Sequence, residues 1–164
     1  MDALADSLTA LEKRFGRVEC ETVEIPLANQ ENYKEEMGDN LERRFFSFER
    51  DVERDALPVL KSICRKLEGQ FADHVDDYLF RTVNIDPGIL TPFNLVMASN
   101  KESNHGVYIE NGVFAEIALV YARGRFVRLP WTSPDFYHEE AIDLFNRVRS
   151  SFELLEATQE SLNL

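Results

Sequence analysis

The stretch 93–129 consists of short runs rich in apolar residues, separated by turn-forming dipeptides, which predicts one continuous antiparallel meander of β-strands joined by tight turns. The dipeptide Asn111-Gly112 lies between two such strands. It tolerates the positive φ angles of a type I′ turn better than most pairs of residues, so it predicts a two-residue hairpin loop. Such a loop pairs Glu110 with Val113 and continues outward, with side chains alternating between the two faces of the sheet.

A second tight turn is predicted at Arg123-Gly124, which places Tyr121 opposite Phe126. With these registers, both faces of the predicted sheet carry apolar side chains. One face collects Val107, Ile109, Phe114, Ala118, Val120, Val127 and Leu129, and the other collects Tyr108, Val113, Ala115, Ile117, Leu119, Tyr121 and Phe126. Since an antiparallel sheet commonly leaves one face in water, we expect either helices on both faces or helices on one face and a partner molecule on the other.

Three segments repeat apolar residues at the spacings of 3 and 4 that define one face of an α-helix: 2–15, 41–83 and 135–160. Pro58 interrupts the central segment. Proline is tolerated in the first turn of a helix but not in its interior, so we expect two helices in this segment or one helix kinked near Pro58. Ser133-Pro134 supplies an N-cap residue followed by proline at the first helical position, which favours a helix start.

Together these elements predict an α+β fold, in which a four- to five-stranded antiparallel meander is packed by the central helical region and by N- and C-terminal helices. The fifth strand is the segment 17–25, whose many charges suit the edge of a sheet. The length of 164 residues is usual for one domain, and no linker rich in Pro, Gly or Ser divides the chain. We therefore expect a single domain over residues 1–164.

Acidic residues outnumber basic ones by 30 to 18, which gives a net charge of −12. Repulsion therefore disfavours direct binding to a nucleic-acid backbone, although an acidic mimic of nucleic acid stays open as an alternative. No segment approaches the ~20 apolar residues that a membrane span requires, and the chain starts without a secretion signal, so we expect a cytoplasmic protein. Cys20 and Cys64 are expected to be reduced thiols.

His105 and Glu116 are the polar exceptions on the first face of the predicted sheet. In the predicted register they are diagonal neighbours across the hairpin, close enough for their side chains to meet. A histidine beside a carboxylate can act as a general base or as a proton-linked switch. An ordinary ion pair at the strand ends accounts for the same two residues, so both interpretations stay open.

A basic and aromatic spot surrounds the last predicted hairpin and consists of Arg123, Arg125, Arg128 and Trp131. Arginine and tryptophan are enriched among the residues that dominate protein interfaces, so this spot is a candidate partner-binding surface. In the alternative interpretation, Trp131 packs beneath the sheet and the arginines pair with carboxylates of the same chain.

Motifs that define well-known chemistries are missing from the sequence. The Cys/His spacing of a zinc site, a glycine-rich phosphate loop and a nucleophile elbow do not occur, so we predict no metal site, no cofactor and no catalytic residue. We hypothesise a non-catalytic protein-binding module, such as a regulatory, adaptor, chaperone-like or immunity-type subunit, whose partner is another protein or a second copy of the chain. The alternative is a small enzyme or ligand sensor with its site near His105 and Glu116.

Overall fold

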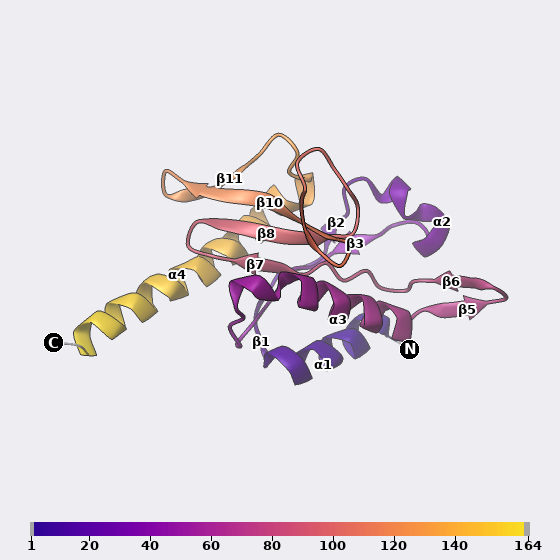
Figure 1. The fold of residues 1–164 in the computed structure, drawn as a ribbon, viewed down its shortest axis with the longest axis horizontal. Helices are drawn as coiled ribbons and strands as arrows, with labels where there is room; N and C mark the ends of the chain where they lie inside the picture. The colour runs from indigo at the N-terminus through magenta and orange to yellow at the C-terminus, as the bar shows by residue number, and fades with distance from the viewer. Residues whose placement is uncertain (1, 163–164) are drawn as a thin grey trace.

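A five-stranded antiparallel sheet with helices packed around it forms the body of the fold (Figure 1). The computed structural model describes residues 2–162, and the side chains of residues 2–152. The helices are α1 (Ala3–Phe15), α2 (Lys34–Met37), α3 (Leu57–Gln70) and α4 (Glu139–Leu162). The predicted α+β class, with helices near both ends of the chain, is confirmed.

The strands divide between the main sheet and three small two-stranded ribbons. The main sheet contains β7 (Gly88–Leu90), β8 (Asn94–Ser99), β9 (Val107–Glu110), β10 (Val113–Ala122) and β11 (Arg125–Arg128). The ribbons pair β1 (Val18–Glu21) with β4 (Phe46–Phe48), β2 (Ile25–Pro26) with β3 (Glu42–Arg43), and β5 (Asp73–Val75) with β6 (Tyr78–Phe80). The charged segment predicted as a fifth strand therefore belongs to the ribbons rather than to the main sheet.

The long strand β10 is the centre of the main sheet, whose order is β11-β10-β8-β7 with β9 also paired to β10. β8 lies along one edge of β10, whereas β9 and β11 share the other edge at opposite ends of it. This order differs from a sequential meander, in which β9 would lie between β8 and β10. The physical reason is the length of the partners: β8 pairs with six residues of β10, and the short strand β9 with only three.

The predicted hairpin turn at Asn111-Gly112 is confirmed, with positive φ angles of 52° and 73°. Glu110 pairs with Val113 as predicted, but the next pair joins Phe114 to Tyr108. One residue of β9 is thus bulged, and the predicted register is wrong by one residue beyond the first pair. A turn determines the pairing only of the residues next to it. A bulge further along shifts the pairing and reverses the faces to which the following side chains point.

The predicted turn at Arg123-Gly124 is confirmed as well, with φ angles of 55° and 79°. Here the register continues without a shift, and Tyr121 pairs with Phe126 as predicted. The two aromatic rings meet edge to face at a centroid distance of 5.2 Å, an arrangement that stabilises aromatic pairs.

A bulge in β10 explains why both faces of the sheet are apolar. The register between β10 and β8 shifts between Ile117 and Leu119, so odd-numbered side chains point to opposite faces before and after the shift. Val113, before the shift, packs in a cluster with Leu57 and Leu60 of α3. Leu119, after the shift, packs in a second cluster with apolar side chains of α4. Helices of the same chain therefore cover both faces of the sheet.

The central helical region is shorter than predicted. α3 spans only Leu57–Gln70, with Pro58 in its first turn, where the missing N–H removes no helical hydrogen bond. Before α3, β4 pairs with β1 through Phe48 and Val18; after it, the β5–β6 hairpin turns at Asp76, whose φ is 52°. Aromatic residues also suit strands, and pairing with β1 outweighs the helical spacing of the phenylalanines near β4.

Both thiols are free, as predicted, with Cys64 buried and Cys20 partly buried. Burial raises the pKa of Cys64 to about 12, because the low-polarity surroundings disfavour the thiolate. Within residues 2–162, no helix combines the length and the apolar character that crossing a membrane requires.

Candidate functional site

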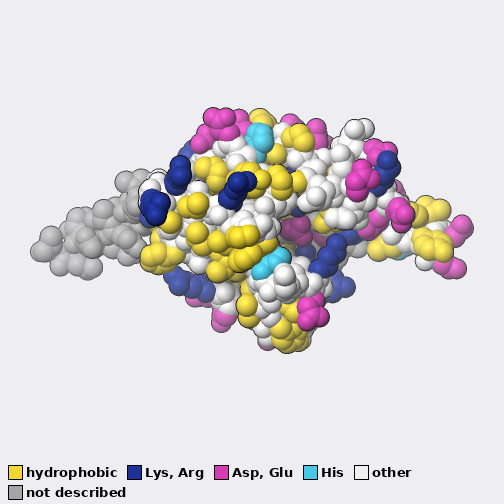
Figure 2. Space-filling model, turned by 90° about the horizontal axis from the view of Figure 1, so that it is seen from above, with side chains coloured by type: hydrophobic (Ala, Val, Ile, Leu, Met, Phe, Trp, Pro, Cys, Tyr) yellow, Lys and Arg dark blue, Asp and Glu magenta, His cyan; other side chains and the backbone are white. Residues whose placement is uncertain are grey.

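A polar cavity of about 370 Å³ lies where the end of β8 meets α3, β3 and the segment between β6 and β7. Its lining includes the basic residues Arg43, Lys61, Arg65, Arg81 and Lys101 and the acidic residues Glu68, Asp86 and Glu116. The face shown in Figure 2 is hollowed near its middle, with acidic atoms inside the recess and Lys or Arg side chains beside it. Basic residues thus outnumber acidic ones around this cavity, the reverse of the chain as a whole, whose net charge is −12.

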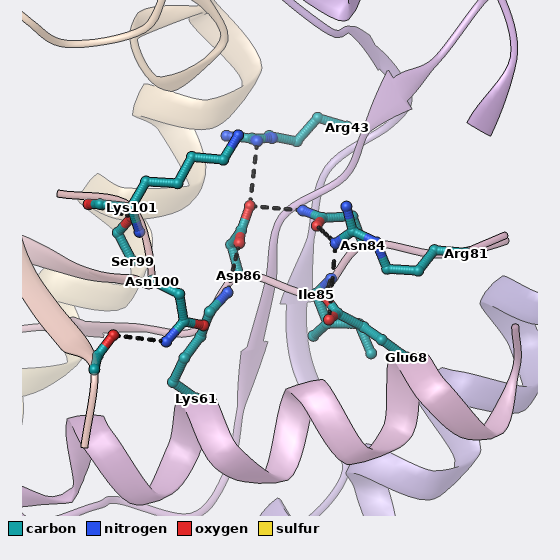
Figure 3. A network of polar contacts seen from close by, with 11 residues as sticks. Arg43, Lys61, Glu68, Arg81, Asn84, Ile85, Asp86, Ser99, Asn100 and Lys101 are labelled. Atoms are coloured by element: carbon teal, nitrogen blue, oxygen red, sulfur yellow. Dashed lines mark hydrogen bonds and ion pairs between the residues drawn. The ribbon is translucent and has the colours of Figure 1, made fainter. Parts of the chain in front are cut away.

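Asp86 is the centre of a polar network in this cavity (Figure 3). Its carboxylate accepts hydrogen bonds from Lys61 Nζ at 3.0 Å and from Asn84 Nδ2 at 2.8 Å, and Arg43 lies 3.5 Å from Oδ2. Burial acts to raise the pKa of Asp86, but attraction by Lys61 and Arg43 outweighs it and holds this pKa below its usual value. Asp86 is therefore ionised at neutral pH and balances two cations.

Arg43 connects this network to the segment that precedes α4. Its guanidinium lies 2.7 Å from Oδ2 of Asp135, whose side chain is fully buried, and 5.0 Å from the centre of the Phe136 ring. Ser133 donates a short hydrogen bond from its hydroxyl to the other carboxylate oxygen of Asp135. A planar guanidinium held between two carboxylates and an aromatic ring has little freedom, so Arg43 is a fixed part of the cavity wall.

Arg81 organises the other side of the cavity. It donates to both carboxylate oxygens of Glu36, at 2.5 and 2.7 Å, and to Oδ1 of Asn84 at 2.6 Å. The hydrogen bonds from Arg81 lower the pKa of Glu36, whereas burial raises the pKa of Glu68, which lies 3.8 Å from the same guanidinium. Glu68 also accepts a hydrogen bond from the backbone N–H of Ile85 at 2.7 Å, which ties α3 to the segment before Asp86.

Two of the five lining cations, Arg65 and Lys101, have no carboxylate within 4.0 Å among the described residues. Both are exposed at the cavity. The ammonium of Lys101 lies over the ring of Tyr33 at 5.4 Å, and its side chain extends across the space that Arg43 and Lys61 enter from opposite sides (Figure 3). These two side chains are therefore available to an anion that enters the cavity.

The predicted neighbours His105 and Glu116 are in contact, with Nε2 2.9 Å from a carboxylate oxygen. The imidazole also stacks on the indole of Trp131, at a centroid distance of 4.9 Å and an angle of 11°. Trp131 donates a hydrogen bond from Nε1 to the carbonyl oxygen of Ile117 at 2.9 Å. Glu116 and Trp131 both line the polar cavity, so these sequence-predicted residues lie at its wall.

The arginines of the predicted basic and aromatic spot lie apart from this cavity. Arg123 and Arg125 are exposed around the β10–β11 turn, and the guanidinium of Arg128 lies 4.8 Å from the ring centre of Tyr137. None of the three is part of the cavity lining, whereas Trp131 is. The structure thus places Trp131 at the cavity and the three arginines elsewhere, and the indole stacks on His105.

Sequence reasoning missed the residues at the centre of the network. Asp86-Pro87-Gly88 consists of turn-forming residues, and Lys61 is one charged position within the helical pattern of 41–83, so neither marks a site in the sequence. No local motif joins Arg43, Lys61 and Asp86, because they come from three separate elements. What distinguishes these residues is that they carry charges in a partly buried cavity. This arrangement depends on the tertiary fold.

The fold and its cavity define this chain as a small α+β domain with a charged, partly buried site. Residues 1–152 match the DUF4416 family, described as a domain of unknown function, and the chain belongs to this family. Searches of curated proteins and of solved structures returned no match to the chain.

Proposed function

We propose that this protein binds a small anionic ligand, carrying a phosphate or carboxylate group, in the polar cavity. The observation that carries the proposal is the pair of cations Arg65 and Lys101, which face the cavity without a carboxylate partner among the described residues. A chain with a net charge of −12 has many acids with which to pair its cations. Other exposed cations, such as Lys66, also lack a carboxylate within 4.0 Å among the described residues. Arg65 and Lys101 differ from them because they line a concave site beside buried charges.

The paired part of the network supports the same function. The Lys61 side chain is only 8% exposed, and charges at such positions are held at a cost in desolvation. Replacement of such buried ion pairs by packed hydrophobic residues is often neutral or stabilising, so the presence of these charges supports a role in addition to stability. One fixed part of the cavity wall is formed by Lys61, Asp86 and Arg43. A ligand held by Arg65 and Lys101 would be oriented against this part of the wall.

Titration with inorganic phosphate and with succinate tests the proposal and distinguishes the two anion classes. Trp131 is the single tryptophan of the chain and lines the cavity, so its fluorescence reports on occupancy, with calorimetry as the second measurement. We expect saturable binding of one of the two anions, weakened about tenfold by Lys101→Gln or Arg65→Gln, since each removes one charge-assisted hydrogen bond.

Lys66→Gln is the matched control. Lys66 is the neighbour of Arg65 on α3, is equally exposed and does not line the cavity, yet its replacement changes the net charge by the same amount. Equal losses of affinity in Lys66→Gln and Arg65→Gln would show a general charge effect and would contradict a site in the cavity. The absence of saturable binding for both anions would contradict the proposal altogether.

As a second function, we propose self-association through β9. All four residues of this strand are exposed, including Val107 at 68% and Tyr108 at 60%, and within the described chain β9 pairs only with β10. An apolar strand with one unpaired edge is a template for another strand, and pairing with a second copy across a two-fold axis closes that edge. Glu110 is the single charged residue of β9, so little repulsion opposes this contact.

Light scattering over a concentration series tests the second proposal. We expect a dimer in the parent chain and a monomer in Val107→Lys, because a charge on an edge strand opposes pairing. Val23→Lys is the control, since Val23 is another exposed valine and lies outside the main sheet. A parent chain that stays monomeric at every concentration would contradict self-association without affecting the anion proposal.

A further inference from the structure

A second, larger cavity of about 1080 Å³ lies among α1, β4, α3, the β7–β8 pair and α4. Its lining is rich in large apolar side chains, which include Leu8, Phe15, Phe46, Leu95, Phe145 and Phe152. The lining also holds charged residues, among them Glu42, Arg50 and Asp51, and the space opens to the surface, so it is an open cavity rather than an interior void. Most of its lining surface is apolar, which makes it a candidate site for an apolar group.

The apolar cavity adjoins the polar one. Arg43, Asn84 and Asp86 of the polar network line both cavities, and so do Met97 and Phe136. The guanidinium of Arg43 stands at this shared wall, 5.0 Å from the ring centre of Phe136 and 5.9 Å from that of Phe45. The residues common to the two linings are thus both charged and apolar, and Arg43 contacts aromatic rings and carboxylates at the same time.

We infer that the ligand is an amphipathic anion, with its phosphate or carboxylate head in the polar cavity and a single alkyl or similar apolar chain in the adjoining apolar cavity. This inference rests on the proposed anion site and adds the class of ligand. A free inorganic anion would leave the apolar cavity unfilled, and an uncharged hydrocarbon would leave Arg65 and Lys101 without an anionic partner. One molecule with both parts satisfies both observations, because residues such as Asn84 and Met97 border both cavities and the two spaces are therefore adjacent.

The length of the apolar chain supplies the test. A series of n-alkyl phosphates from methyl to decyl, each used below its critical micelle concentration, is titrated into the full chain with Trp131 fluorescence and calorimetry as readouts. We expect affinity to rise about fourfold for each methylene that enters the apolar cavity, the fold-change that corresponds to ~0.8 kcal/mol for each buried CH₂ group. The matching n-alcohols should bind more weakly, because they lack the head group that the cations recognise.

Two variants on α1 locate the chain. Leu8→Trp places a larger ring in the apolar cavity and should flatten the dependence on chain length, as measured by calorimetry alone because the variant adds a second tryptophan. Ala5→Trp is the control, because Ala5 is exposed on the same helix and does not line the cavity. Circular dichroism of both variants shows whether they fold, and the chain-length slope of the parent protein decides the inference if Leu8→Trp does not.

The outcomes separate the inference from the proposal beneath it. If methyl phosphate binds and chain length makes no difference, the amphipathic ligand is contradicted and the anion site stands. If n-alcohols bind as tightly as the phosphates, or if neither series binds, the amphipathic ligand is contradicted, and the anion site is then decided by the titration with inorganic phosphate and succinate. A slope that persists unchanged in Leu8→Trp would place the alkyl chain outside the apolar cavity and would overturn the inference.

Discussion

Lys61 Nζ and Asp86 Oδ1 lie 3.0 Å apart, although 25 residues separate them in the sequence. The lysine comes from α3 and the aspartate from the segment before β7, so this contact joins the helix on one face of the sheet to the edge of the sheet itself. The ammonium is nearly buried, with 8% of the side chain exposed. The pair therefore combines a structural role with a place on the floor of the polar cavity.

Replacing Asp86 tests the structural role. Asp86→Asn leaves Lys61 and Arg43 with one carboxylate fewer, and we expect the free energy of unfolding to fall by about 1–3 kcal/mol, because a cation that is mostly buried loses its counter-charge. Urea denaturation at pH 7 measures this change. The control is Asp39→Asn, which breaks an exposed ion pair with Lys34 at 2.9 Å and should cost less than about 1 kcal/mol.

The same variant should lose its effect in acid. The pKa of Asp86 is held below the value of about 3.9 for an unfolded aspartate, so its stabilising contribution is fully present above pH ~4 and disappears as the pH falls through the folded-state pKa. The gap between the parent chain and Asp86→Asn should therefore close below pH ~4. A gap of constant size from pH 7 to pH 3 would show that the ionised form of Asp86 contributes nothing.

Glu68 should show the opposite dependence on pH. Burial raises its pKa, so the folded state holds the proton more tightly than the unfolded state, in which the pKa is about 4.3. Stability from this group is present at low pH and is lost as the pH rises through the folded-state pKa. We expect Glu68→Gln to gain stability relative to the parent chain as the pH rises from 4 to 7 in urea denaturation. An unchanged difference across that range would contradict the raised pKa.

The α+β class, the helices near both ends of the chain, and the turns at Asn111-Gly112 and Arg123-Gly124 could be predicted because each depends on local sequence. The strand order could not, because it depends on the competition between β8 and β9 for the edge of β10. The bulge near Ala118 was equally hidden, since nothing in the alternation of residues marks where a strand will shift its register.

Some contacts of the candidate site could likewise be predicted from the sequence, and others could not. Contact between His105 and Glu116 was predicted from a hairpin register that proved wrong by one residue. The contact forms all the same, because His105 lies in the turn before β9, where the strand register does not fix its side chain. The network around Asp86 draws on β3, α3 and two loops. Its assembly requires the complete fold, so neither the periodicity of the sequence nor any short motif indicates this network.

Two glycines should respond in opposite ways to the same substitution. A methyl group on Gly88 would run into Met97 Sδ and would lie 3.1 Å from the carbonyl oxygen of Val96, whereas a methyl group on Gly69 meets nothing within 4 Å. We expect Gly88→Ala to lose about 1–3 kcal/mol through overpacking and Gly69→Ala, within α3, to gain about 0.5–1 kcal/mol. Thermal denaturation of both variants measures the difference. Equal effects would contradict the close approach of β7 to β8.

The two thiols should differ in reactivity. Cys64 is 3% exposed and its pKa is raised to about 12 by burial, so almost none of it is thiolate at pH 8. Cys20 is partly exposed on β1. A thiol reagent at pH 8 should therefore modify one cysteine in the folded parent chain and none in Cys20→Ser, as counted by mass spectrometry. Rapid modification of Cys64 in the folded Cys20→Ser variant would contradict its burial.

The two contacts that hold Trp131 in the wall of the polar cavity can be tested by substitution. Its Nε1 donates to the carbonyl oxygen of Ile117, while its ring stacks on His105. Trp131→Phe keeps an aromatic ring but removes the donor, so we expect a loss of about 0.5–1.5 kcal/mol in the free energy of unfolding. His105→Ala removes the stacking partner but leaves the hydrogen bond, and the double variant shows whether the two contacts are coupled. Losses that simply add would mean that the hydrogen bond and the stacking contact stabilise the protein independently, whereas a smaller combined loss would show that both act on one shared position of the ring.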